Sequence, residues 1–261
     1  WLWIWEKNSS QDKFFIIEDL KGASPMGKFI INEEFWTVFP EAQINVLVVK
    51  NIDNNSSEEK HSYFSELLNS AAKEAVQFLN EETFSQNKVV DEWRQAFSKF
   101  KTKKGARSSI EALLKRVNQN REFTPINPLV DIYNSVSLKY AVPCGGEDLN
   151  SINGDLHLGK AKGGESFLPL GADQDSPALP EEIIYYDQDG AICRCLNWRE
   201  AQRTMLTDDT TDAVLFIESI NKEQAERANQ AMNELKQLID SYFHTTSTSV
   251  MLTPKDSAFE F

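Results

Sequence analysis

Three stretches of the chain place apolar residues at helical spacing. Over residues 63–79 they recur at steps of three and four residues, which predicts a helix with one buried face. The same spacing over residues 88–100 and 223–243 predicts a second helix and a long amphipathic third one. Each of these helices needs an apolar surface to cover.

Capping residues mark two shorter helices. Ser108 and Glu111 have the spacing of a capping box, so we expect a helix over residues 110–117. Pro128 suits the first turn of a helix, and the pattern after it continues to about Tyr140. Both helices lie in the first half of the chain.

Strands are predicted by β-branched stretches and by turn residues. The apolar stretches that predict strands are 28–32, 44–49, 183–186, 191–196, 213–217 and 248–252. Asp189-Gly190 between two of them is typical of a hairpin turn. Because most helices come before Pro143 and most strands after it, we expect an α+β fold, with mixed or antiparallel sheets flanked by helices.

The chain divides into three predicted parts. Residues 1–25 contain an apolar start without a basic leader, which does not resemble a signal peptide. They are interpreted as a leader or an added extension before Met26. Residues 26–245 form one predicted α+β domain, and residues 246–261 a C-terminal strand and tail.

Charge narrows the range of partners. The net charge of −13 disfavours a general nucleic-acid binder, because phosphates repel an acidic surface. One basic segment, residues 99–116, could still contact RNA; the alternative is a solvated loop followed by a helix face. No apolar run reaches membrane-spanning length, so no membrane partner is expected.

The cysteines bear on location and metal binding. The three residues Cys144, Cys193 and Cys195 are too few for a disulfide framework, which favours the cytoplasm. Cys193 and Cys195 alternate along a predicted strand and should share a face. No second pair has ligand spacing, so we expect buried thiols, and neither a metal nor a cofactor.

Known catalytic signatures are missing from the sequence, but two polar stretches stand out. No phosphate-binding loop, nucleophile elbow or zinc-spaced histidine pair occurs. In residues 142–149 a glycine pair precedes two carboxylates, which suits close approach to a ligand or a capped tight turn. In residues 193–211 a strand is followed by Asn, Trp, Arg and hydroxyl groups, which could bind a base, an aromatic ring or an anion. The alternative for the second stretch is a buried Trp with Arg paired to nearby acids.

The order of several segments resembles the B3/B4 editing domain of the phenylalanyl-tRNA synthetase β subunit. The resemblance covers about residues 90–220, roughly half of the chain. Asn127, Asp131 and Asn134 follow the pattern of one helix of that domain, and residues 143–149 fall on a Pro-to-Leu segment. Free-standing proteins with this domain are more similar still. They share the segments Arg107-Ser108-Ser109-Ile110-Glu111-Ala112-Leu113, Gly145-Gly146-Glu147-Asp148-Leu149, Phe167-Leu168-Pro169-Leu170-Gly171 and Asn197-Trp198-Arg199.

This resemblance implies hydrolysis of a wrongly attached amino acid from tRNA, acting in trans. A water molecule would attack the ester, and the developing oxyanion would be stabilised. The implied catalytic residues are Glu147, Asp148 and Thr207, of which the two acids bind the amino group or orient water. The implied substrate-binding residues are Asn134, Gly145, Gly146, Asn197, Trp198, Arg199 and Thr210. The implied tRNA-backbone contacts are Lys101, Lys103, Lys104 and Arg107.

Departures from the family pattern keep other functions open. Where the synthetase has His and Phe, this chain has Gly145 and Glu147, so tyrosine specificity is not carried over. Its Gly-Glu pair has no clear counterpart; Glu200 or Arg203 falls nearby. A non-catalytic binder of an amino acid or nucleoside is the main alternative, and a protein partner of a synthetase is a third. No segment resembles the aminoacylation module, so we do not expect the chain to charge tRNA.

Overall fold

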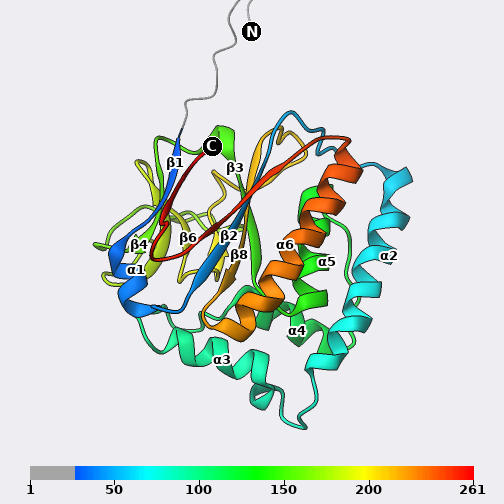
Figure 1. Cartoon of the computed structure of the whole chain (residues 1–261), viewed down its shortest axis with the longest axis horizontal. Helices are drawn as coiled ribbons and strands as arrows, with labels where there is room; N and C mark the ends of the chain where they lie inside the picture. The colour runs from blue at the N-terminus through cyan, green and yellow to red at the C-terminus, as the bar shows by residue number, and fades with distance from the viewer. Residues whose placement is uncertain (1–26) are drawn as a thin grey trace, which may run out of the picture.

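The computed structural model describes residues 27–261, which form two sheets and six helices in that range (Figure 1). The helices are α1 (Glu33–Val38), α2 (Glu58–Ala75), α3 (Lys88–Phe97), α4 (Ser109–Asn118), α5 (Pro128–Tyr140) and α6 (Lys222–Phe243). The strands are β1 (Lys28–Ile31), β2 (Gln43–Val49), β3 (Cys144–Asp148), β4 (Leu156–Lys160), β5 (Ile183–Asp187), β6 (Gly190–Arg194), β7 (Arg199–Glu200), β8 (Ala213–Ser219), β9 (Thr248–Leu252) and β10 (Ala258–Glu260). The predicted leader, residues 1–25, lies outside the described residues. The α+β prediction is confirmed.

The first sheet has four antiparallel strands in the order β3-β8-β2-β9. Its side chains alternate, so one face carries Leu47 and Leu215 and the other carries Val46 and Phe216. Strand β3 lies at one edge. This position matters for the site, because an edge strand has one side free of ladder partners.

Helices cover the Leu47–Leu215 face of this sheet. The core there joins the strands to α5, α6 and Phe64 of α2, and Figure 1 shows these three helices side by side. Asn127 caps α5 by accepting a hydrogen bond from the Val130 amide at 3.1 Å. Burial of the apolar helix faces on the sheet accounts for most of the stabilisation of this layer.

The second sheet has six strands in the order β10-β1-β4-β5-β6-β7. It is mixed, because β1 pairs in parallel with β4 while the other pairs are antiparallel. The two C-terminal strands divide between the sheets: β9 pairs with β2, and β10 pairs with β1. The predicted strand 248–252 is confirmed, and β10 was not predicted.

The two sheets share a second core with α1, α3 and α4. Three aromatic rings hold the sheets together: the Phe29 ring lies 5.0 Å from Phe216 and 5.9 Å from Tyr185, and the last two lie 5.1 Å apart. Rings packed in this way contribute beyond their buried area. Strands β1, β5 and β8 are thereby fixed relative to one another.

The predicted hairpin is confirmed, but its second strand ends early. Strand β6 stops at Arg194, because Cys195 and Leu196 have backbone φ values of +49° and +62°. Such angles belong to turns, not strands. Cys195 therefore does not continue the strand from Cys193 as we predicted. The chain turns there instead, toward β7.

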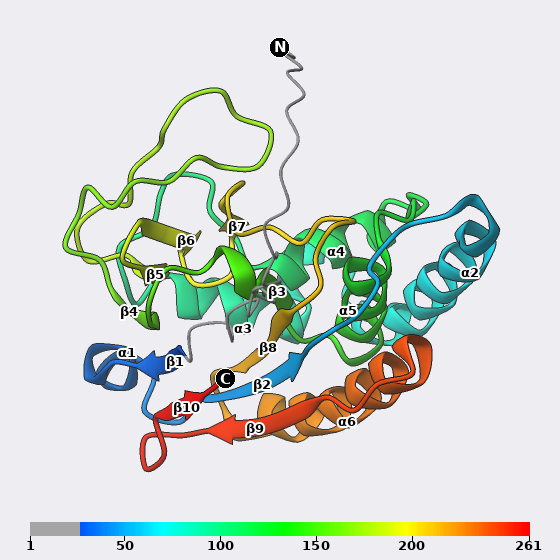
Figure 2. The same ribbon diagram turned by 90° about the horizontal axis from the view of Figure 1, so that it is seen from above.

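A buried ion pair supports this turn. Arg194 donates to both Glu182 oxygens, at 2.8 and 2.5 Å, and both side chains are essentially inaccessible to solvent. Arg194 also donates to the Ser176 carbonyl at 2.6 Å, which ties down the loop between β4 and β5. This long loop lies above β6 and β7 in Figure 2.

The predicted helices are confirmed with shifted ends. Helix α2 begins at Glu58 and ends at Ala75, a few residues before the predicted limits at each end. The Ser108 hydroxyl caps α4 by accepting from the Glu111 amide at 3.3 Å. Within residues 27–261, no helix is both long and apolar enough to cross a lipid bilayer.

Candidate functional site

A cavity of about 310 Å³ lies between the two sheets, at the edge formed by β3. Strands β3, β5, β6, β7 and β8 contribute to its wall, together with the start of α4 and the turn after β6. Its lining residues are Ser109, Cys144, Gly145, Gly146, Glu147, Leu170, Tyr185, Cys193, Leu196, Asn197, Trp198, Arg199, Glu200, Phe216 and Glu218. The size suits an amino acid or a similar small group.

Strand alternation explains why a carboxylate of β3 is inside. Gly145 and Glu147 share one face of the strand, and Gly146 lies on the other. A Cβ added to Gly145 would point toward Glu200, with its Oε1 at 3.8 Å. A Cβ on Gly146 would instead lie 2.2 Å from Leu215 of the helix-covered core. The absence of a side chain at Gly145 therefore leaves room for a ligand.

The β3 main chain offers polar groups to the same space. The Pro143 carbonyl and the Leu149 amide bond to Glu218 and Asp212 on the β8 side. The Asp148 amide points the other way and bonds to the Thr204 carbonyl. By antiparallel alternation, the Gly146 amide also points away from β8. This amide is a candidate donor to a bound ligand.

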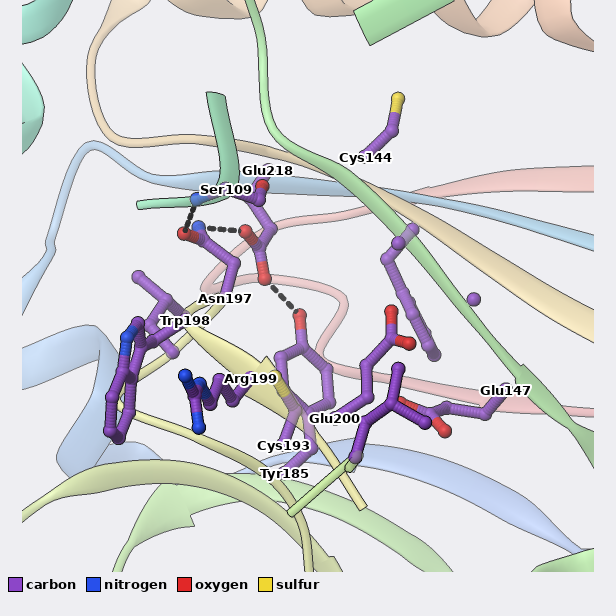
Figure 3. Close-up of a pocket in the computed structure, with 15 residues that line it drawn as sticks. Ser109, Cys144, Glu147, Tyr185, Cys193, Asn197, Trp198, Arg199, Glu200 and Glu218 are labelled. Atoms are coloured by element: carbon purple, nitrogen blue, oxygen red, sulfur yellow. Dashed lines mark hydrogen bonds between the residues drawn. The ribbon is translucent and has the colours of Figure 1, made fainter. Parts of the chain in front are cut away.

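A chain of hydrogen bonds crosses one side of the cavity (Figure 3). The Tyr185 hydroxyl donates to Glu218 at 2.7 Å, and the Asn197 amide group donates to the other Glu218 oxygen. The Asn197 oxygen accepts from the Ser109 amide at 3.2 Å. Burial raises the pKa of Glu218 to about 7, although the two donated bonds lower it. The chain fixes the orientation of Asn197.

Two further carboxyl groups, Glu147 and Glu200, lie next to each other in Figure 3. Burial, followed by the nearby Glu200 carboxylate, holds the pKa of Glu147 well above its usual range. Burial raises the pKa of Glu200 to about 7. Since two close carboxyls resist double ionisation, this pair holds a proton near neutral pH.

Trp198 and Arg199 lie on the other side of the cavity, away from this pair (Figure 3). Arg199 is exposed, and its guanidinium carbon lies 5.3 Å from the Trp198 ring centroid. Arg199 and Glu200 are consecutive in β7, so their side chains project to opposite faces. Leu170 of the loop between β4 and β5 completes the rim.

Six of the predicted site residues line this cavity: Gly145, Gly146, Glu147, Asn197, Trp198 and Arg199. Their roles remain predictions. Bringing them together needs both sheets, because the glycines and Glu147 belong to one sheet and Arg199 to the other.

Four other predicted residues lie outside the cavity wall. Asp148 accepts from the Thr210 hydroxyl at 2.7 Å, and that hydroxyl accepts from the Thr207 amide at 3.0 Å. Thr207 and Thr210 thus lie in the turn before β8, and Asp148, the last residue of β3, bonds to that turn. Asn134 is half-buried on α5. Asp148 also accepts from the Asn150 amide at 2.9 Å, as in the alternative of a capped turn for residues 142–149.

The basic residues predicted to bind RNA lie beside the cavity. Lys101, Lys103, Lys104 and Arg107 are all exposed. Their loop pairs with the strand end at Glu182, and the Lys103 amide donates to the Cys195 sulfur at 3.5 Å. The loop also leads directly into Ser109 at the cavity wall.

Sequence reasoning gave no site role to the cavity residues Ser109, Tyr185, Glu200 and Glu218, although Glu200 was noted near the position of the family's Gly-Glu pair. Glu218 follows an apolar strand and Glu200 follows Arg199, so each resembled an ordinary polar strand end. A signal for Glu218 was present, because it sits inside a strand whose other residues are buried and mostly apolar. Its carboxylate therefore needed a partner, and only the fold shows that the partner is Tyr185.

Metal and thiol chemistry gain no support from the geometry. Among residues 27–261, no group of three or more His, Cys, Asp or Glu side chains could hold a metal ion. Burial raises the pKa of Cys144 and Cys193 well above the usual range, and that of Cys195 to about 12. Because thiols are poor nucleophiles when protonated, burial disfavours nucleophilic chemistry at these three positions.

Comparison with known proteins identifies the family. Comparison with curated proteins found no match. A solved structure of an N-terminal fragment of the phenylalanyl-tRNA synthetase β subunit from Pyrococcus horikoshii is similar at 12% identity and a TM-score of 0.48. The similarity covers 89% of this chain and 53% of the fragment, so the chain spans about half the fragment's length. The model of the B3/4 domain matches residues 92–245, which is more than half of the chain, and the protein therefore belongs to the B3/4 domain family.

Proposed function

We propose that this protein takes the aminoacyl end of a charged tRNA into the cavity between the sheets and hydrolyses the ester bond in trans. The observation that carries the proposal is the pair of buried Glu147 and half-buried Glu200 in a cavity of about 310 Å³. An aminoacyl group fits such a space, whereas a folded tRNA stays outside. The predicted RNA-binding loop leads directly into Ser109 of the cavity wall.

The carboxyl pair supplies the base in this proposal. A group whose pKa lies near 7 can accept a proton from water at neutral pH, and burial raises the pKa of Glu200 to about 7. The Glu200 carboxylate takes one water proton while the water oxygen bonds to the ester carbonyl carbon. The carbon–oxygen bond to the ribose then breaks, the proton passes to the ribose oxygen, and the free amino acid leaves.

Main-chain and basic groups would complete the site. The Gly146 amide, which points away from β8, would donate to the developing oxyanion. Trp198 can stack on the terminal adenine, and Arg199 can bind a phosphate next to it. The lysines at positions 101, 103 and 104 would follow the tRNA backbone.

Deacylation tests the proposal directly. The protein is incubated with correctly and wrongly charged tRNAs, and amino-acid release is followed. We expect selective release, and Glu200→Gln should slow it by about 100-fold or more because it removes the general base. Glu122→Gln is the matched control, since it removes one exposed carboxylate that does not line the cavity. Release that is unchanged in Glu200→Gln, or no release from any tRNA, contradicts the proposed reaction.

A non-catalytic binder of an amino acid or nucleoside is the second candidate. The net charge of −13 favours it, because an acidic protein repels tRNA. Salt dependence separates the two functions. A tRNA complex should weaken steeply with rising salt, and replacing Lys101, Lys103 and Lys104 by Ala should reduce that dependence. A small-ligand complex should show neither effect.

A further inference from the structure

The Glu147–Glu200 pair lacks a positive partner. Glu147 is only 4% exposed, and its Oε2 atom has no hydrogen-bond partner within the described chain. The nearby Thr204 hydroxyl lowers the pKa of Glu147, but burial outweighs it. Across residues 27–261, neither Glu147 nor Glu200 forms a salt bridge. The nearby Arg203 is committed to Asp187 through two bonds, of 2.9 and 2.5 Å. A buried carboxylate without a partner is costly, so this arrangement needs an explanation.

The chemistry of the pair restricts what can fill the space. An anionic group is repelled, and an apolar group leaves the carboxyl oxygens unsatisfied. A metal ion lacks the ligands it needs within residues 27–261. An ammonium group has three donors and a positive charge, so it can bond both carboxylates at once.

The rest of the cavity is consistent with an amine attached to a carbon skeleton. Tyr185, Leu196 and Phe216 offer apolar surface, and Leu170 borders the opening. Among residues 27–261, Arg199 alone contributes a Lys or Arg side chain to the wall, on the side opposite the acid pair (Figure 3). A ligand with an ammonium at one end and a polar or anionic group at the other would match both ends.

We propose that Glu147 and Glu200 together form a receptor for a ligand ammonium group, so the aminoacyl group that enters the cavity must carry a free amine. This inference rests on the proposed function and defines its substrate class. N-acylated aminoacyl groups that carry no second amine, including such peptidyl groups, are excluded because an amide nitrogen carries neither the charge nor the three donors. The amine can be the α-amine or a side-chain amine.

Binding should release protons near neutral pH. The cation favours ionisation of a pair that otherwise retains a proton, because its charge offsets the repulsion between the carboxylates. The other titratable and charged groups around the pair belong to several elements. They are Tyr133 on α5, Cys144 on β3, Tyr185 on β5, Cys193 on β6, Arg199 on β7, Glu218 on β8 and the Arg203–Asp187 ion pair. The tyrosines and the cysteines have raised pKa values because of burial, so they stay neutral and release nothing at this pH. Glu218, whose pKa burial raises to about 7, can add to the release, and its share persists when Glu147 or Glu200 is replaced.

Calorimetry with small amides tests the receptor. The probes are phenylalaninamide, leucinamide and alaninamide, their N-acetyl forms, and N-acetyl-lysinamide, whose only amine is in the side chain. Each is titrated at about pH 6, where the free amines are already protonated, in two buffers of different ionisation enthalpy, which gives the number of protons that the protein releases. We expect at least one free amide to bind about tenfold to 100-fold more tightly than its acetylated form, as for loss of hydrogen bonds to charged groups.

Variants assign the effect to the pair. Glu147→Gln and Glu200→Gln keep the side-chain shape, and each should reduce both affinity and proton release, whereas Glu122→Gln should change neither. Circular dichroism checks that each variant is folded. Binding of N-acetyl-lysinamide identifies a side-chain amine as the source, and its exclusion identifies the α-amine. Equal binding of free and acetylated amides, or no binding of any free amine, overturns the proposal.

The same design separates this inference from the deacylase. Amine binding without ester hydrolysis would support the ammonium receptor and contradict the proposed deacylase activity. Hydrolysis of N-acetylaminoacyl-tRNA at the rate of the free form retains the enzyme and overturns the receptor.

Discussion

The buried carboxyl of Glu218 should make the stability of this protein depend on pH. Its side chain is 4% exposed, and burial raises its pKa from 4.5 to about 7. The folded state therefore favours the protonated form. Its contribution to stability is complete below about pH 4.5 and is lost as the pH rises through 7, and the loss amounts to ~3 kcal/mol at about 1.4 kcal/mol per pKa unit.

Glu218→Gln removes this contribution while keeping the shape of the side chain. The glutamine oxygen can accept from Asn197, and its amide group can donate to the Tyr185 oxygen. Urea unfolding of the parent and the variant is measured from pH 5 to 8.5. The parent should lose about 2–3 kcal/mol relative to the variant over this range. Contributions from Glu147 and Glu200 are present in both proteins and cancel.

Two results of the urea experiment would contradict the predicted effect of burying Glu218. A relative change in unfolding free energy below about 0.5 kcal/mol, close to the error of extrapolation, would refute the burial argument. A relative change of opposite sign would show that the hydrogen bonds from Tyr185 and Asn197 outweigh burial. Glu122→Gln, at an exposed position, should show no pH-dependent difference.

Three further predictions concern the two glycines of β3 and the buried Arg194–Glu182 ion pair. Gly145→Val should leave the unfolding midpoint nearly unchanged but abolish ligand binding and deacylation, because the nearest atom to an added Cβ is a Glu200 oxygen at 3.8 Å across the cavity. Gly146→Ala, one residue along, should instead cost about 1–3 kcal/mol in urea unfolding, because its Cβ would lie 2.2 Å from a core leucine. Arg194→Met should destabilise the fold by about 3–5 kcal/mol, since it leaves Glu182 buried without a partner. The double variant Arg194→Met/Glu182→Leu should recover most of this loss, and a double variant no more stable than the single one would contradict that account.

Local patterns predicted the elements well where one face is apolar. Helix α5 begins at Pro128 as expected, because proline suits a first turn and Asn127 caps it. The hairpin around Asp189-Gly190 followed from its turn residues. The end of β6 was missed because Cys195 and Leu196 adopt left-handed angles that their side chains do not favour. Contacts with the loop after α3 hold that turn.

The site was predicted in part. The sequence indicated which continuous segments contribute to it, but not which distant segments meet. The segment 145–147 stood out for its glycines and carboxylate, and the segment 197–199 for its polar and aromatic side chains. The structure places both in one cavity. Thr207 and Thr210 stood out for the same reason and lie in the turn before β8. Composition cannot distinguish a ligand-binding polar cluster from a capped turn, because both use the same side chains.

The sequence by itself determined the class of fold and the family. Apolar periodicity, caps and turn residues act over a few positions, so they can be recognised locally, and the order of the segments carries the family resemblance. Tertiary structure decided which carboxylates meet. Glu147, Glu200 and Glu218 come from three strands in two sheets, and no local pattern relates them. Their pKa values, their partners and the cavity between them exist only once the sheets pack, because burial of charge depends on what lies across the core.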